Sequence, residues 1–110
     1  MISQDDVEAA LEFMRKNAQP LAAAKANRIY LEQFRKSKKA MLFSECEEGT
    51  VAAKENWAYA HPEYLEVLEG LKAAVEQEEH IKWKMTAAEM KVEVWRTQQA
   101  NARSVDAAHR

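Results

Sequence analysis

The sequence predicts an all-α, oligomeric protein: a long antiparallel helical hairpin with a short connecting helix and a short N-terminal helix. Helix-forming residues dominate the 110 residues, whereas only two glycines and two prolines occur. Apolar residues also recur at alternating spacings of three and four along the second half of the chain. A chain of this length forms one domain at most, so residues 1–110 are expected to be a single helical domain.

The N-terminal helix is expected within residues 1–19. Ser3 is a suitable N-cap, and acidic residues follow it in the first turn, where the helix dipole favours anions. This helix should run to about Asn17, with its inner face formed by Val7, Ala10, Leu11 and Met14. Pro20 suits the first turn of a helix but not the interior of a continuous one, so a break is predicted there.

The predicted hairpin spans residues 20–103. Its first long helix should end near Glu47, because Gly49-Thr50 can stop one helix and cap the next, expected over Val51–Tyr59. His61-Pro62 should open the last helix, which would reach roughly Arg103 and be about 60 Å long. The tail, residues 104–110, is expected to fray.

Two apolar seams predict how the long helices pair. The seam of the last helix comprises Tyr64, Leu68, Leu71, Val75, Glu78, Ile81, Met85, Ala88, Val92 and Trp95. The facing seam comprises Tyr30, Leu31, Phe34, Met41 and Leu42, with Lys38 in its middle. Pairing the seams about the short helix suggests an ion pair between Lys38 and Glu78 that sets the register. Alternatively, Lys38 extends its ammonium group to solvent at the edge of the seam.

A second apolar line on the last helix predicts self-association. Trp83, Ala87, Met90 and Val94 lie away from the first seam, and a two-helix hairpin cannot bury both sides. Either the first helix folds over this line or another subunit covers it. Because the first helix is short, we expect Trp83, Met90 and Val94 to form an oligomer interface.

Charge is segregated along the chain although the net charge is only −2. Residues 14–42 carry eight bases against one acid, Glu32, whereas residues 43–81 carry ten glutamates against two lysines. Five of these bases share one helical arc, opposite the apolar seam: Lys25, Arg28, Arg35, Lys36 and Lys39. Cations at such spacing suit successive phosphates of a nucleic acid, but an ordinary solvated face is nearly as good an explanation. Trp57 and Tyr59, beside Lys54, suit either stacking on unpaired bases or local packing.

Signals for other functions are weak. The sequence lacks a Glu-x-x-His pair, a phosphate-binding glycine loop and a nucleophile elbow, so we expect no catalytic residue, no metal and no cofactor. The longest apolar runs are far shorter than a membrane span of about 20 residues, so no membrane association is expected. A single cysteine, Cys46, fits a reducing cytoplasm.

The segment from Tyr30 to Arg103 resembles the UvsY-type recombination mediators of phages. The resemblance lies in four successive stretches: FRKSKKAML (34–42), TVAAKENWAY (50–59), YLEVLEGLKAAVEQEEHIKWKM (64–85) and VEVWRTQQANAR (92–103). It implies a ring-like oligomer that binds single-stranded DNA and helps load a RecA-like recombinase onto DNA covered by a single-strand-binding protein. The location it implies is the cytoplasm of an infected bacterial host.

The resemblance also implies which residues contact DNA. Lys54 matches the first cation of the family's VA-x-K-x-R segment, whereas Asn56 stands where the second would be. The expected contacts therefore shift toward Arg35, Lys36 and Lys39. The function predicted is that of a non-enzymatic recombination mediator. The alternative is a helical adaptor or assembly protein without nucleic-acid binding, in which the charged blocks pair between subunits.

Overall fold

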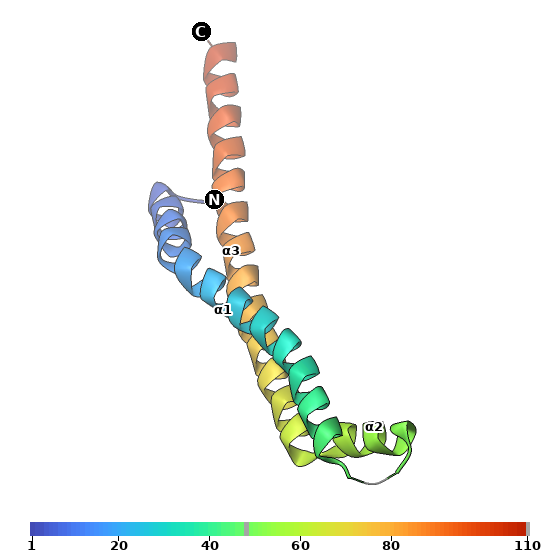
Figure 1. Ribbon diagram of the computed structural model, residues 1–110. Coiled ribbons are helices and arrows are strands. Elements are labelled where there is room, and N and C mark those ends of the chain that lie inside the picture. The colour runs from blue at the N-terminus through green and yellow to red at the C-terminus, as the bar shows by residue number, and fades with distance from the viewer. Residues whose placement is uncertain (48, 110) are drawn as a thin grey trace. The chain divides into compact units, whose positions relative to one another are not determined.

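The computed structural model describes residues 1–47 and 49–109. Over these residues the chain forms three helices and no strand: α1 (Gln4–Glu45), α2 (Val51–Ala60) and α3 (Pro62–Ala108), as Figure 1 shows. The prediction of an all-α fold is confirmed. The chain divides into two compact units, Met1–Leu21 with His80–Arg110 (unit 1) and Ala22–Glu79 (unit 2).

The start of α1 is fixed by a reciprocal cap. The Ser3 hydroxyl accepts a hydrogen bond from the Asp6 N–H at 3.1 Å, and the Ser3 N–H donates to the Asp6 carboxylate at 2.9 Å. Two backbone donors that the helix leaves unpaired are thereby satisfied. The backbone bond from Ser3 is the main reason why the pKa of Asp6 lies below its ordinary value. The predicted N-cap at Ser3 is confirmed.

The predicted break at Pro20 is wrong, because α1 continues through it as one helix of 42 residues. Proline has no N–H, so the Lys16 carbonyl loses the hydrogen bond that residue 20 would otherwise donate. Fifteen or more helical residues on either side outweigh this local cost, since most helical stability comes from packing of the whole element. Pro20 lies next to the boundary between the two units, at Leu21 and Ala22.

The turns around α2 follow the sequence signals. Gly49 has a φ of +102°, a conformation that L side chains rarely adopt, and the Thr50 hydroxyl caps α2 by accepting from the Ala53 N–H at 3.2 Å. At the other end, the His61 N–H donates to the Ala58 carbonyl, and the His61 ring nitrogen Nδ1 accepts from the Glu63 N–H at 3.0 Å. The predicted ends of α2 are therefore correct to within one residue.

The predicted end of the last helix near Arg103 is too early, whereas the fraying expected for residues 104–110 stays a prediction. Helix α3 extends to Ala108, beyond the expected end near Arg103. The segment after Arg103 contains neither glycine nor proline, and two alanines favour continued helix. Arg110 lies outside the described residues.

Unit 2 has a small apolar core where its three helical segments meet. Leu42 from α1 is fully buried with Ala58 from α2 and Tyr64 from α3, and Phe43 and Leu68 pack against them. Tyr30 and Met41, placed in the seam by the sequence pattern, are instead exposed. On α3, Val75 is exposed and its neighbour Ala74 is buried. The buried faces of both helices are thus rotated slightly from the seams that the sequence pattern predicted.

The predicted ion pair between Lys38 and Glu78 is wrong. Lys38 pairs with Glu63 at 3.0 Å, whereas Glu78 pairs with Arg28. Within unit 2 these pairs run in antiparallel order, since the higher residue number on α1 meets the lower one on α3. Arg28 lies ten residues before Lys38, about 15 Å along the helix. The predicted register was wrong because the start of α3 contacts the end of α1 directly, as the contact between Leu42 and Tyr64 also shows.

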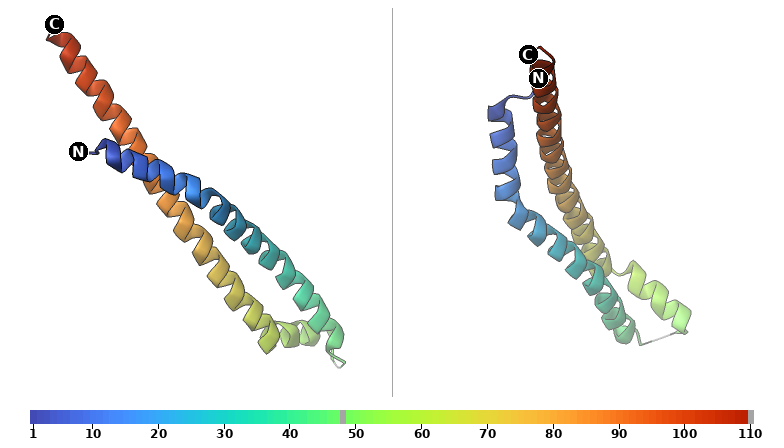
Figure 2. Two further views of the ribbon diagram at one scale, coloured as in Figure 1. Left: turned by 90° about the vertical axis from the view of Figure 1, so that its left-hand side faces the viewer. Right: turned by 90° about the horizontal axis from the view of Figure 1, so that it is seen from above.

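Unit 1 joins the two ends of the chain. The Ile2 N–H donates to the Gln98 side chain at 3.2 Å, and Val7 and Ala10 of α1 are buried, as are Ile81 and Ala88 of α3. Figure 2 shows the first turns of α1 beside α3 within this unit. Of the predicted inner face of the first helix, Val7 and Ala10 are buried and Met14 is half-buried, but Leu11 is exposed. The first segment therefore packs against its own chain.

Candidate nucleic-acid interface

Three of the predicted phosphate-binding residues lie together in unit 2. Arg35, Lys36 and Lys39 of α1 line a hollow of about 380 Å³ whose other walls are Tyr59 of α2 and Tyr64 of α3. The spacing of the cations within one helical turn brings all three to the same side of α1. Two aromatic residues thus share one hollow with three cationic side chains, a combination that also occurs in proteins that bind single-stranded nucleic acids.

Lys39 and Tyr59 are in direct contact. The Lys39 ammonium nitrogen lies 4.3 Å from the centre of the Tyr59 ring, a cation–π geometry. The pKa of Lys39 is raised above its ordinary value, chiefly by a side-chain hydrogen bond with Tyr59. Tyr59 also meets Tyr64 edge to face, with ring centres 5.4 Å apart and planes at 77°. Because Tyr64 is buried, it fixes the orientation of the Tyr59 ring from one edge.

The charge of Arg28 is already paired within the chain, and its role as a phosphate contact stays a prediction. Its guanidinium donates to both carboxylate oxygens of Glu78 and to Glu32, the latter at 2.9 Å. The hydrogen bond to Glu78, followed by that to Glu32, raises the pKa of Arg28 further above its already high ordinary value. Two carboxylates neutralise the guanidinium, which leaves little attraction for a phosphate. Glu32, which Arg28 contacts, is the one acid among the eight bases of residues 14–42.

The two remaining predicted contacts are less closely tied to the hollow. Lys25 is exposed on α1, about 15 Å along the helix from Arg35. It forms no ion pair among the described residues. Lys54 of α2 is half-buried, with its ammonium nitrogen 5.7 Å from the centre of the Phe43 ring. Neither side chain lines the hollow formed by Arg35, Lys36 and Lys39.

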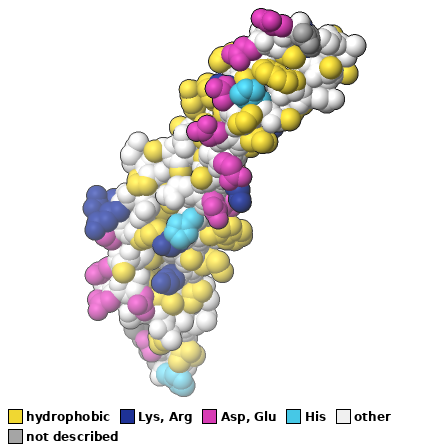
Figure 3. All heavy atoms as spheres, turned by 90° about the horizontal axis from the view of Figure 1, so that it is seen from below, with side chains coloured by type: hydrophobic (Ala, Val, Ile, Leu, Met, Phe, Trp, Pro, Cys, Tyr) yellow, Lys and Arg dark blue, Asp and Glu magenta, His cyan; other side chains and the backbone are white. Residues whose placement is uncertain are grey.

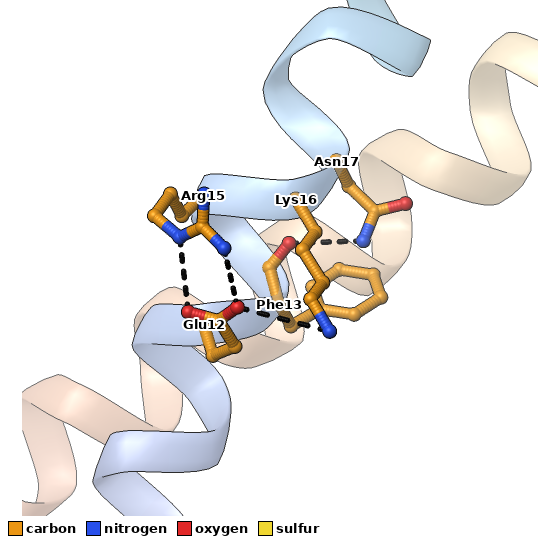
Figure 4. Close-up of polar contacts among 5 residues, drawn as sticks. All are labelled: Glu12, Phe13, Arg15, Lys16 and Asn17. Carbon is orange, nitrogen blue, oxygen red and sulfur yellow. Dashed lines mark hydrogen bonds and ion pairs between the residues drawn. The ribbon is translucent and has the colours of Figure 1, made fainter.

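The two cations at the start of the basic segment, Arg15 and Lys16, share one carboxylate, Glu12. Figure 4 shows Glu12 between Arg15 and Lys16, with Arg15 donating at 2.6 and 3.0 Å and the Lys16 ammonium at 3.7 Å. The hydrogen bond from Arg15 lowers the pKa of Glu12. On the face drawn in Figure 3, basic side chains occur in separate groups among acidic and apolar ones. The basic character predicted from composition is therefore concentrated at a few positions.

Tyr64 is the residue of the hollow that sequence reasoning did not assign to it. Its position in the apolar seam predicted burial, which is confirmed, but its contact with Tyr59 depends on how the end of α2 meets the start of α3. The sequence did contain a hint of this contact, because only a few residues, including His61-Pro62, separate Tyr59 from Tyr64. Trp57, the other predicted stacking residue, instead meets His61, with ring centres 5.0 Å apart.

The predicted oligomer interface is exposed in unit 1. Trp83 is 69% exposed, Met90 63% and Val94 44%, and all three project from the same segment of α3. Beside them, Ala87 lines a groove of about 340 Å³ whose other walls include Phe13 of α1 and two lysines of α3, Lys84 and Lys91. These large apolar side chains are not covered by the first segment of α1, although that segment packs against the neighbouring face.

Two other kinds of site are absent from the described residues. Nowhere in residues 1–47 and 49–109 do three or more histidine, cysteine or acidic side chains gather as a metal would require. None of the helices in this part of the chain has an apolar stretch that would span a bilayer.

Comparison of this chain with protein-family models, with curated proteins and with solved structures finds no match. The candidate interface is therefore defined by its geometry and by the residues that line it.

Proposed function

We propose that this protein binds single-stranded DNA as a homo-oligomer and assists the loading of a RecA-like recombinase. The observation that carries the proposal is the gathering of Arg35, Lys36 and Lys39 around Tyr59. In the proposed arrangement α1 and α3 form an antiparallel hairpin connected by α2, and the basic hollow lies near its closed end. Lys25 would extend the row of phosphate contacts along α1, and Lys54 would supply a further contact from α2.

The physical basis of binding would be release of counterions from DNA. Each phosphate neutralised by a lysine or arginine frees condensed cations, so affinity should fall steeply as salt increases. Three to five such contacts give only weak binding by one subunit. Several subunits held together would bind the same strand with much higher avidity, because each further contact becomes intramolecular.

The exposed strip of Trp83, Met90 and Val94 supports the oligomeric part of the proposal. Water-exposed side chains of this size, grouped on one helix segment, favour association with another apolar surface. In this proposal the subunits associate through residues of unit 1, whereas the residues that line the hollow all belong to unit 2.

The role in recombinase loading rests on the resemblance to UvsY-type mediators. Exposed glutamates on the first part of α3 would repel phosphates and are better suited to a protein partner. Glu66, Glu69 and Glu76 form this acidic surface. The recombinase and the single-strand-binding protein are its proposed partners.

A salt titration with a fluorescein-labelled oligonucleotide tests the proposal. We expect binding to single-stranded DNA in preference to duplex, with affinity falling as salt rises. The double variant Arg35→Ala with Lys39→Ala should weaken binding at least tenfold, since two phosphate contacts are lost. Arg15→Ala with Lys16→Ala is the matched control, because it removes the same charge from side chains already paired with Glu12. Absence of binding at low salt would reject the proposal in favour of a helical adaptor.

Light scattering tests the oligomer. At micromolar concentration the mass should be several times 12.6 kDa, and Trp83→Ser with Met90→Ser should reduce it. Ile29→Ser with Tyr30→Ser is the control, since it removes two exposed apolar side chains from unit 2. A monomeric mass for the unaltered chain would remove the assigned interface.

A further inference from the structure

The ring of Tyr59 is presented to solvent within the hollow that Arg35, Lys36 and Lys39 line. We infer that this hollow takes one unpaired nucleotide, with its base stacked on the Tyr59 ring and its phosphate held by Arg35 and Lys36. The inference rests on the proposed binding of single-stranded DNA and adds to it a specific contact with the base.

The environment of Tyr59 suits a stacking platform. Tyr59 as a residue is 44% exposed and it lines the hollow, so part of it is accessible to a ligand. Tyr64, almost fully buried, holds one edge of the ring, so little rotational freedom would be lost on stacking. The volume of about 380 Å³ lies in the range of small-molecule sites, about 300–1,000 Å³.

Lys39 contributes to the same contact. Its ammonium lies over the ring, 4.3 Å from the ring centre. A base that stacks on this face would displace the ammonium, which in the proposed complex would contact a neighbouring phosphate instead. Arg35 and Lys36 border the hollow from the adjoining turn of α1, so phosphate groups on either side of the base would meet a cation. Glu55 is the carboxylate whose charge also acts on Lys39, and it moderates the positive potential without occupying the hollow.

Trp57 does not provide an equivalent platform. Its ring meets His61 and lines a different hollow with Glu45, Cys46, Glu47 and Ala53. The two carboxylates beside it would repel the phosphates of a stacked nucleotide. Tyr59 and Trp57 are thus two exposed aromatics of the same helix in opposite electrostatic surroundings. This pair offers a matched comparison.

Base stacking distinguishes strands by whether a base face is free. Bases of a duplex are stacked on both sides, whereas an unpaired base can leave its neighbours and stack on a side chain. A strand lacking bases keeps its phosphates but has nothing to place on Tyr59. The contact would therefore add a preference for bases to an attraction that otherwise depends on charge alone.

The test compares two labelled oligonucleotides of equal length and phosphate number, one normal and one built from abasic tetrahydrofuran residues. Fluorescence anisotropy at fixed low salt should give tighter binding of the normal strand to the unaltered protein, by about 5- to 100-fold. Tyr59→Leu should reduce this ratio by at least threefold, whereas Tyr59→Phe should preserve it because the aromatic face remains. Trp57→Leu is the control and should leave the ratio unchanged.

The outcomes separate this inference from the proposed function. Equal, salt-dependent binding of both oligonucleotides would overturn the nucleotide site while leaving DNA binding in place. A base preference that Tyr59→Leu leaves intact would also overturn it, since stacking would then occur elsewhere. Binding of neither strand would reject both the site and the proposed function. Circular dichroism of each variant verifies that its helices are retained.

Discussion

Arg28 and Glu78, fifty residues apart, form an ion pair within unit 2 in which the guanidinium contacts both carboxylate oxygens. Glu78 is only 6% exposed, and Arg28 is also shared with Glu32. A buried carboxylate loses its hydration, so it is stable as an anion only when such hydrogen bonds replace water. The pair therefore fixes which turn of α3 lies against which turn of α1.

Glu78→Ala is expected to destabilise the protein, because it leaves the Arg28 guanidinium with only Glu32 as a partner and opens a cavity where the buried Glu78 side chain lay. The double variant Arg28→Met with Glu78→Leu should recover most of this loss, since neither charge then has to be desolvated. Urea unfolding followed by circular dichroism measures both. A loss below about 1 kcal/mol for Glu78→Ala would contradict the role assigned to the pair.

The contact between Lys38 and Glu63 should contribute a pH-dependent part of stability. The hydrogen bond from Lys38, followed by its charge, lowers the pKa of Glu63 in the folded chain. Stabilisation is therefore complete above the ordinary glutamate pKa and is lost as pH falls through the lowered value. The urea concentration at the midpoint of unfolding should therefore fall between about pH 5 and pH 3, and we expect this fall to be smaller in Lys38→Met. Lys72→Met, at an exposed lysine of α3, should not alter this slope.

Leu42 has no exposed surface and lies against Ala58 and Tyr64 at the junction of all three helices. Leu42→Ala should cost about 2–5 kcal/mol, from lost apolar burial and from the cavity left behind. Leu65→Ala removes the same atoms from a half-exposed position and should change stability by only about 0.5 kcal/mol. Equal effects of the two substitutions in urea unfolding would show that this junction does not pack as described.

Pro20 should reduce stability as it stands, because it is an exposed residue inside a continuous helix. Pro20→Ala restores the hydrogen bond to the Lys16 carbonyl and should raise the free energy of unfolding by about 1–3 kcal/mol. Thermal unfolding followed at 222 nm measures the change. Ala18→Gly, nearby on the same helix, is the opposite control and should lower stability by about 1 kcal/mol. A decrease for Pro20→Ala would indicate that the helix requires the proline there.

Local signals in the sequence predicted the elements well. Ser3, Thr50 and Gly49 act through backbone groups within a few residues, so their effects depend little on the rest of the fold. The interruption at Pro20 was predicted from local cost alone, and the packing of a long helix outweighed it. The end of the last helix was predicted too early, near Arg103, although the residues after it favour helix and contain no stop signal.

The contacts between helices were harder to predict. Periodicity indicated which residues of α3 face inward, but not how far the helix slides along α1, and Lys38 was therefore assigned to Glu78. Because Glu78 was assigned to Lys38, the pairing of Glu78 with Arg28 was not predicted from the sequence. The cluster of Arg35, Lys36 and Lys39 was correctly placed on one face of α1, whereas its contact with Tyr59 and Tyr64 depends on the position of α2. Counting charges along the sequence cannot reveal which aromatic residues lie beside the cations.

The division of the chain into its two units has a consequence for the order of folding. Unit 2 is one uninterrupted stretch, Ala22–Glu79, so its contacts close comparatively short loops. Unit 1 unites the two ends, as in the bond between Ile2 and Gln98, and must close nearly the whole chain. Closing a short loop costs less conformational entropy than closing a long one, so unit 2 should fold first and the two segments of unit 1 should pair afterwards. During synthesis, residues 22–79 could thus organise before the second segment of unit 1, which begins at His80, has emerged from the ribosome.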